Sequence, residues 1–204
     1  LPAPSEDGLV GWACSAALDR LGFATSGELA AFWALIRPED AKVWCATALA
    51  SGAIEEIEVE AADGNLRRVF ARPGTVEEAA ALTAPSGRVR ILSPFDPALR
   101  DRNRAERIFG FYYRIEVFVP EPKRTYGYYV FPVMEADRMI GRIDMRARRA
   151  EGALHVAAYW PEAGVALTKG REERLLAELD RLSTFVGCNT VTFADGWRRQ
   201  PLAV

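Results

Sequence analysis

The character of the sequence changes near Arg88, from mainly helical to mainly strand-like segments, and this change limits the folds that the chain can adopt. Before it, apolar residues recur at helical spacing in three short segments, at about residues 8–22, 25–33 and 38–52. After it, segments rich in aromatic and β-branched residues predominate, which is typical of strands. Residues 84–87, Ala-Pro-Ser-Gly, have the composition of a linker. We therefore predict an α+β chain with two domains, at residues 1–84 and 88–204.

The first domain has the element order of a winged helix-turn-helix module. Its three predicted helices precede an alternating segment at 54–60, an Asp-Gly turn signal at 63–64 and a returning segment at 66–71. Thr25 and Glu28 have the spacing of a capping box at the start of the second helix. Three helices followed by a strand, a turn and a strand predict a winged-helix domain.

The second domain is predicted to be an antiparallel, β-barrel-like domain. Its strand-like segments lie at residues 88–95, 112–120, 128–136, 139–149, 153–160 and 189–194. Residues 101–110 between the first two are expected to form one or two helical turns. One late amphipathic helix is predicted at 171–187, because four apolar residues share a face there: Leu175, Leu179, Leu182 and Val186.

Charge is distributed unevenly along the chain. Residues 1–87 have a net charge of −7, whereas residues 88–150 carry fourteen basic and eight acidic side chains, a net charge of +6. Thirteen of these fourteen cations are arginine, whose planar guanidinium donates two hydrogen bonds to a phosphate at once. A phosphate-binding surface and a solvated face of salt bridges both fit this pattern.

Several classes of protein are disfavoured by composition. The three cysteines, Cys14, Cys45 and Cys188, form no Cys-x-x-Cys pair, and His155 is the only histidine. We therefore expect no disulfide, no metal site and no cofactor, and a reducing, cytoplasmic setting. The uncharged run at 43–54 is too short to span a bilayer. The chain starts at Leu1, with no secretory signal, and we expect it to be a piece of a longer protein.

An ordered set of short motifs runs through the second domain. The motifs are Ser93-Pro94-Phe95-Asp96, Asp101-Arg102 with Arg104, Phe109-Gly110-Phe111, Tyr113-Arg114, Pro120-Glu121-Pro122-Lys123-Arg124, Gly127-Tyr128-Tyr129 and Gly141-Arg142-Ile143-Asp144. In this order and spacing they resemble the C-terminal region of the AlkZ/YcaQ family of bacterial DNA glycosylases. The tandem winged helices of that family also fit the predicted first domain.

The resemblance implies DNA repair by cleavage of the N-glycosidic bond of alkylated or crosslinked bases. It also implies a catalytic Gln-x-Gln or Gln-x-Asp motif in an N-terminal winged helix. The only glutamine here is Gln200, so no catalytic residue is carried over. We therefore expect a C-terminal, DNA-positioning portion that is inactive alone. Its expected partners are double-stranded DNA, held mainly by the backbone, and upstream winged-helix domains of the same protein.

Candidate DNA contacts lie in the motifs. Lys123, Arg124 and Tyr126 are predicted at a hairpin tip stiffened by two prolines, which suits insertion beside a phosphate backbone; a solvated hairpin is the alternative. The other candidates are Arg102, Arg104 and Arg142. For Arg102 and Arg104, phosphate contact and internal ion pairs with Asp96 and Asp101 remain equally open. Glu116 and Glu135 have no acidic partner at a defined spacing and are expected to be structural.

The predicted third helix is a poor base reader. It carries Glu39 and Asp40 but only one cation, Lys42, and phosphates repel carboxylates. We expect a scaffold, with Arg67, Arg68 and Arg72 either on the DNA backbone or paired with the glutamates of the facing strand. The alternative functions are a winged-helix transcriptional regulator with a ligand-sensing β-domain and a β-barrel that binds a small molecule.

Overall fold

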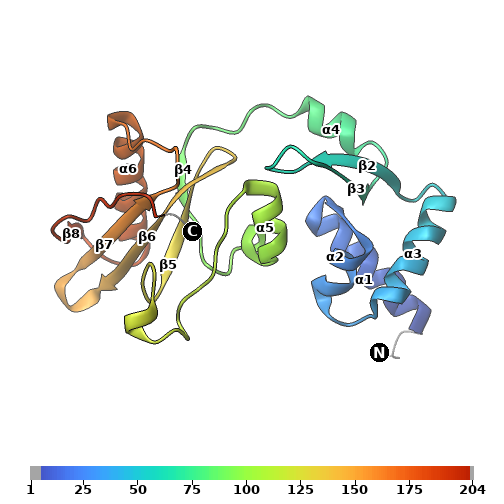
Figure 1. The fold of residues 1–204 in the computed structure, drawn as a ribbon, viewed down its shortest axis with the longest axis horizontal. Helices are drawn as coiled ribbons and strands as arrows, with labels where there is room; N and C mark the ends of the chain where they lie inside the picture. Colours follow the sequence, from blue (N-terminus) through green and yellow to red (C-terminus); the bar gives the residue numbers. More distant parts are fainter. Residues whose placement is uncertain (1–5, 203–204) are drawn as a thin grey trace. The chain divides into compact units, whose positions relative to one another are not determined.

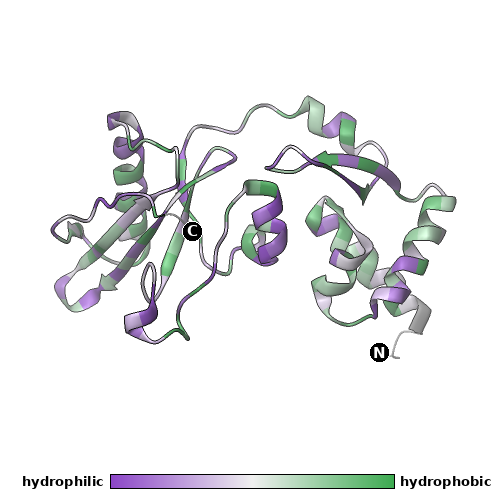
Figure 2. Cartoon of the chain, in the orientation of Figure 1, coloured by the Kyte–Doolittle hydropathy of each residue, from purple (hydrophilic) through white to green (hydrophobic). Residues whose placement is uncertain are grey.

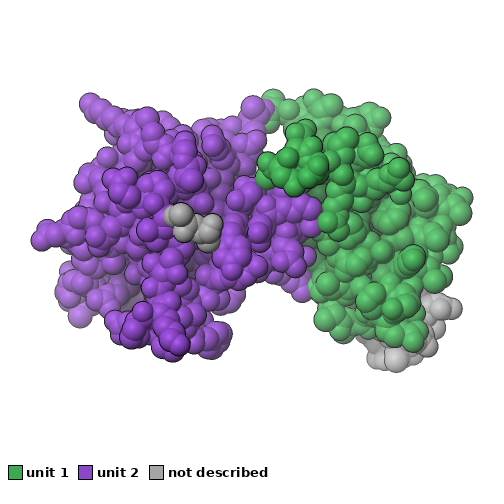
Figure 3. Space-filling view, viewed as in Figure 1, with its two compact units in different colours: residues 1–83 green, residues 84–204 purple. Residues whose placement is uncertain are grey.

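The computed structural model describes residues 6–202 of the chain. The chain divides into two compact units, residues 1–83 (unit 1) and residues 84–204 (unit 2), as Figures 1 and 3 show. Helices and strands occur in both units, which confirms a mixed α+β chain. Each unit has its own buried apolar cluster.

Three helices form most of the core of unit 1: α1 (Glu6–Leu21), α2 (Ser26–Trp33) and α3 (Pro38–Ala50). The predicted capping box begins α2. The Glu28 N–H donates to Thr25 Oγ1 at 3.3 Å, and the Thr25 N–H donates to the Glu28 carboxylate at 2.7 Å. Mostly small side chains let the helices approach closely, and the buried set includes Cys14, Ala17, Leu18, Leu29, Ala41, Cys45 and Ile54.

A three-stranded antiparallel sheet completes unit 1. Strands β1 (Phe23–Ala24), β2 (Glu55–Glu60) and β3 (Leu66–Ala71) lie in the order β1-β3-β2. The predicted Asp-Gly turn joins β2 to β3, and Gly64 has a φ of +81°, which glycine adopts without strain. A short helix, α4 (Thr75–Ala81), follows.

Unit 2 contains a five-stranded sheet in the order β4-β5-β6-β7-β8. Its strands are β4 (Val89–Ile91), β5 (Val130–Glu135), β6 (Arg138–Arg148), β7 (Ala153–Pro161) and β8 (Thr190–Phe193). In this order β4 and β8 are edges, so the predicted barrel is an open, half-barrel sheet (Figure 1).

The prediction of a wholly antiparallel sheet is wrong at one pair. The late helix, α6 (Lys169–Phe185), connects β7 to β8. It returns the chain to the end of the sheet where β7 begins, so β8 starts beside Ala153. The two strands consequently pair in parallel, as strands joined by a crossover helix do. The helix itself is where the sequence predicted it, and Leu175 and Leu179 of its apolar face are fully buried.

Two apolar clusters pack against the sheet. On one face, α6 packs against a cluster that includes Val89, Val133, Ile143, Val156 and Tyr159. A second cluster joins Met139 of the sheet to the 3-10 turn η1 (Pro97–Leu99), to helix α5 (Arg102–Phe109) and to the residues after it: Leu99, Ala105, Phe111 and Tyr113. Figure 2 shows α5 as mainly hydrophilic, so it buries only a narrow face.

The strand predicted at 112–120 is absent, which is the largest correction. Residues 111–129 form an irregular loop, the 111–129 loop, with one 3-10 turn, η2 (Glu121–Lys123). Phe111 and Tyr113 are buried and Tyr112 is exposed, as in a strand, but the alternation ends at Arg114. Pro120 and Pro122 have no N–H for a strand ladder. A second 3-10 turn, η3 (Arg149–Glu151), joins β6 to β7.

Candidate nucleic-acid interface

The six candidate DNA-contacting residues all lie in unit 2, on α5, the 111–129 loop and β6. Arg102 and Arg104 belong to α5, Lys123 ends η2, Arg124 and Tyr126 follow it in the loop, and Arg142 lies in the middle of β6. The structure gives these residues two different environments. Three belong to a partly buried stack of rings and guanidinium groups, and the other three lie outside it.

Arg142 is a buried cation. Its side chain is 3% exposed, and its guanidinium carbon lies 4.5 Å from the ring centre of Phe111 and 4.4 Å from that of Tyr126. The guanidinium also donates to Glu162 Oε1, from Nε at 3.0 Å and from Nη2 at 2.9 Å. Both ring faces and a carboxylate therefore satisfy Arg142 inside the protein. The prediction that it contacts a phosphate does not fit this environment.

The contacts of Arg142 continue in both directions into a cation–aromatic stack. Phe111 stacks on Tyr113 with ring centres 5.9 Å apart, and Tyr126 meets Trp160 edge-on at 5.3 Å. At the far end, the guanidinium carbon of Arg102 lies 5.0 Å from the Tyr113 ring centre. The stack thus runs through six residues: Arg102, Tyr113, Phe111, Arg142, Tyr126 and Trp160.

Arg102 is directed into this stack and toward backbone carbonyls. It donates to Leu99 O at 2.6 Å and to Pro94 O at 3.2 Å. Asp96 and Asp101 act as helix N-caps. Asp96 accepts from the Ala98 N–H at 2.9 Å, and Asp101 accepts from the Arg104 N–H at 3.0 Å. Arg102 therefore ties α5 to the residues before it. Arg104, in the first turn of α5, is half-buried.

A single carboxylate organises the 111–129 loop. Glu116 accepts hydrogen bonds from the backbone N–H groups of Thr125, Tyr126 and Gly127 at 2.7, 2.8 and 3.0 Å. Burial raises the pKa of Glu116, but these hydrogen bonds outweigh it and leave the pKa below its usual value. The expected hairpin is therefore a loop folded around a charged side chain, and the expected structural role of Glu116 is confirmed.

Lys123 and Arg124 lie on this loop beside its Glu116 anchor. Lys123 is exposed, and Arg124 is half-buried. Arg124 donates from Nε to Val119 O at 2.9 Å, and its guanidinium carbon lies 4.9 Å from the Tyr128 ring centre. The loop thus positions the half-buried Arg124, while Lys123 is an exposed charge.

The sequence did not reveal that several aromatic side chains near and within the 111–129 loop are exposed. Phe118 is 94% exposed, midway between Glu116 and Pro120. The guanidinium carbon of Arg114 lies 4.4 Å from the ring centre of the exposed Tyr112. Cations interleaved with exposed rings suit stacking on bases and insertion between them. The signal in the sequence was the aromatic content of 109–129, which strand-like alternation explained equally well.

In unit 1, α3 and the residue before it present little positive charge that could bind a phosphate. The exposed positions of α3 are mostly apolar or acidic, and Val43 and Leu49 are among them. Arg37 donates to both Asp40 carboxylate oxygens, at 2.9 and 2.8 Å.

Two of the three candidate arginines on and after β3 pair with carboxylates, while Arg67 is exposed. Arg68 lies 3.7 Å from Glu56 and 3.8 Å from Glu58 on β2, the pairing weighed from the sequence. Arg72 pairs instead with Asp19 of α1 at 2.8 Å and donates to Ser15.

The remaining chemically reactive groups show no site. Within residues 6–202, no three or more His, Cys, Asp and Glu side chains are grouped as metal ligands. The three cysteines are buried and unpaired. Burial raises the pKa of the Cys14 thiol to about 11 and that of Cys45 to about 12, so neither is a nucleophile at neutral pH. No helix in the same range is long and apolar enough to cross a membrane.

Comparison with protein families decides what kind of protein this geometry belongs to. The model of the family described as DNA glycosylase AlkZ-like matches residues 2–185. The chain belongs to the AlkZ-like DNA glycosylase family. Membership in the AlkZ-like family confirms the resemblance stated from the motifs.

One solved AlkZ-like structure is similar to this chain. It is the DNA glycosylase AlkZ of Streptomyces sahachiroi, with a TM-score of 0.57 and 21% sequence identity. The match covers 95% of this chain and 48% of the Streptomyces chain, so this chain spans about half the length of that protein. At this identity the match shows a shared fold.

Proposed function

We propose that this chain is the C-terminal, DNA-positioning portion of an AlkZ-like glycosylase that excises alkylated or crosslinked bases. No Gln-x-Gln or Gln-x-Asp motif occurs in the sequence, and we assign the catalytic motif to an upstream winged-helix domain of the same protein. The chain alone then binds DNA without releasing a base. We also propose that residues 1–84 and 88–204 are separate domains.

We assign unit 1 to the winged-helix class and give it the role of a scaffold. Its element order and its β1-β3-β2 sheet support the class. The acidic start of α3, its apolar exposed positions and the Arg68 pairing with β2 support the role. A transcriptional regulator would need a helix able to read base edges, and α3 carries Lys42 as its only cation.

The observation that carries the proposal is the 111–129 loop. Glu116 fixes its backbone through three N–H groups, while Lys123 is exposed and the half-buried Arg124 is held by Val119 O. A cationic loop that is ordered before binding loses little conformational entropy when it contacts a phosphate backbone. We therefore infer backbone contacts with double-stranded DNA from this loop, and propose Arg104 of α5 as a further contact.

Two measurements on one preparation of the chain test this proposal. A gel shift with a duplex of about 20 base pairs should show weak binding that falls steeply with salt. Incubation with alkylated duplex should release no base above the uncatalysed rate. Base release by a clean preparation would refute the assignment as a non-catalytic portion. Strong preference for one sequence over random duplex would favour the regulator.

A further inference from the structure

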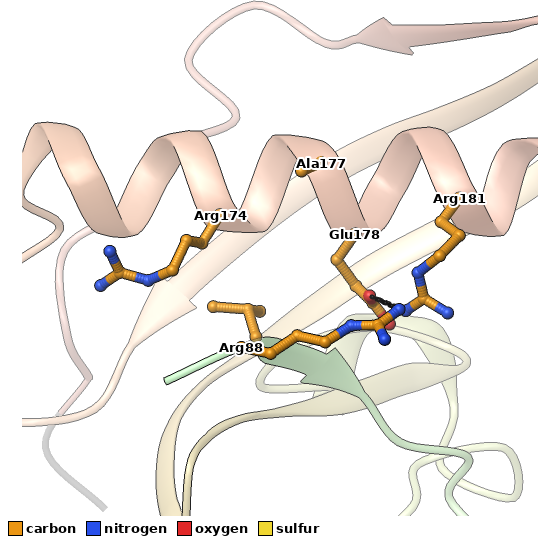
Figure 4. A pocket seen from close by; sticks show the side chains of 6 residues that line it. Arg88, Arg174, Ala177, Glu178 and Arg181 are labelled. Atoms are coloured by element: carbon orange, nitrogen blue, oxygen red, sulfur yellow. Dashed lines mark hydrogen bonds and ion pairs between the residues drawn. The ribbon is translucent and has the colours of Figure 1, made fainter. Parts of the chain in front are cut away.

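A second basic surface lies on unit 2, on α6 and the start of β4. A pocket of about 390 Å³ is lined by Arg88 and Val89 on one side and by Arg174, Ala177, Glu178 and Arg181 of α6 on the other (Figure 4). Arg171 lies on the same side of α6, one turn before Arg174. Charge counting did not find this surface, because residues 151–204 carry a net charge of only −1.

Two carboxylates form the base of this surface. Glu178 is 5% exposed and pairs with Arg181 and, at 3.8 Å, with Arg88. The Ile91 N–H also donates to it at 3.4 Å. In the same way Glu135 of β5 accepts from Nε of Arg171 and of Arg174, each at 2.9 Å. The two glutamates lie on the inner side of the surface and orient the guanidinium groups of the outer arginines, as Figure 4 shows around Glu178.

The arginines outnumber the carboxylates that hold them. Four cations, Arg88, Arg171, Arg174 and Arg181, share two glutamates, so this arginine patch has a net charge of +2. Burial lowers the pKa of Arg181, and repulsion from Arg88 and Arg90 lowers it further. Each guanidinium has five N–H donors, and pairing with one carboxylate leaves several unused. A balanced network of salt bridges would not leave this excess.

We propose that the arginine patch binds a backbone phosphate of double-stranded DNA, as a contact separate from the 111–129 loop; this rests on the proposed function. Arg174 and Arg181 are seven residues apart, which is about 10 Å along the helix. Arg88 lies between them across the pocket (Figure 4). A row of partly exposed, pre-oriented guanidiniums with an inward carboxylate base has the chemistry of phosphate recognition.

The double variant Arg174→Gln/Arg181→Gln tests the patch without stranding a carboxylate. Arg171 still pairs with Glu135, and Arg88 still pairs with Glu178. Arg146→Gln/Arg149→Gln is the matched control, because it removes two exposed arginine charges outside the patch. Duplex binding of the full chain is measured by fluorescence anisotropy across a salt series, with thermal melting of every variant.

We expect the patch variant to bind about tenfold more weakly at low salt, with a salt slope reduced by up to about two. The control should change affinity less than twofold. If the patch variant does not fold, the single substitutions Arg174→Gln and Arg181→Gln replace it, each expected to lower the slope by about one.

Three results would overturn the inference. Unchanged affinity and slope in the patch variant, while Lys123→Ala/Arg124→Ala weakens binding, would refute the patch and leave the proposed function standing. No duplex binding by the parent would refute both. A thermal shift with inorganic phosphate that the patch variant loses, without any effect of the patch variant on duplex binding, would assign the patch to free phosphate instead of DNA.

Discussion

The guanidinium carbon of Arg142 lies 4.4 Å from the ring centre of Tyr126. Both residues were candidate DNA contacts from the sequence, and the structure pairs them with each other. Their contact joins the centre of β6 to the loop that carries Lys123 and Arg124. The stack therefore positions the candidate interface, and its disruption should act first on stability.

Replacing Arg142 should destabilise unit 2. Arg142→Met removes the ion pair with Glu162 and two ring contacts, and we expect a loss of about 2 kcal/mol in unfolding free energy. Arg146→Met, an exposed position on the same strand, should cost less than about 1 kcal/mol. Urea denaturation measures both. Equal midpoints for the two variants would show that the stack does not stabilise the domain.

The order of the 111–129 loop should depend on pH through Glu116. The pKa of Glu116 is lowered by its hydrogen bonds from Thr125, Tyr126 and Gly127, even though burial opposes this. A carboxyl group with a lowered folded-state pKa stabilises above its unfolded pKa, about 4.3, and loses that contribution as the pH falls through the folded value.

The amide resonances of Thr125 and Gly127 should therefore hold constant at neutral pH and move in acid, with a midpoint below about 4.3. Glu116→Gln should remove this transition, whereas Glu121→Gln, an exposed position in the same loop, should keep it. A midpoint at the ordinary pKa of a glutamate would show that these hydrogen bonds do not stabilise the charged carboxylate of Glu116.

The exposed cations of the loop should contribute to DNA affinity. Lys123→Ala/Arg124→Ala should weaken duplex binding and reduce its salt slope by up to about two, since each cation on a phosphate adds about 0.9. Lys42→Ala on α3 should change little, because Glu39 and Asp40 precede it. If Lys42→Ala abolished binding and the double variant bound normally, unit 1 would be the groove reader.

Phe118 should contribute to DNA binding and not to folding. Its side chain is 94% exposed, so Phe118→Ser buries no polar group and should leave the melting temperature unchanged. We expect severalfold weaker duplex binding, through loss of an apolar ring that enters between base steps. Leu82→Ser, an exposed apolar position on unit 1, is the control. Equal affinities for the two variants would exclude this role.

Gly141 should tolerate no side chain. A Cβ there would lie 2.6 Å from the Trp160 carbonyl oxygen on β7 and 2.7 Å from the Tyr159 hydroxyl. Gly141→Ala must therefore separate β6 from β7 locally, and we expect a loss of about 2 to 3 kcal/mol. Gly87→Ala, where a Cβ meets nothing within 4 Å, should be neutral. Thermal melting that ranks them otherwise would show that the two strands move apart easily.

Features encoded by neighbouring residues were predictable from the sequence. The Thr25–Glu28 capping box, the Asp-Gly turn before β3 and the apolar face of α6 each depend on spacings within one element, and each occurs where predicted. The family resemblance was also visible in the sequence, because its motifs keep their order and spacing along the chain.

Tertiary structure alone decided the rest, because the deciding partners are distant in sequence. Residues 112–120 have strand composition, but Glu116 binds backbone groups nine to eleven residues later and folds them into a loop. The same holds for Arg142, whose identity suggests a surface cation until Phe111 and Glu162 enclose it. Similarly, Arg88 and Arg181 form one patch only because α6 packs on β4. Composition determined which chemistry the chain carries, and long-range packing decided which of its charges face the solvent.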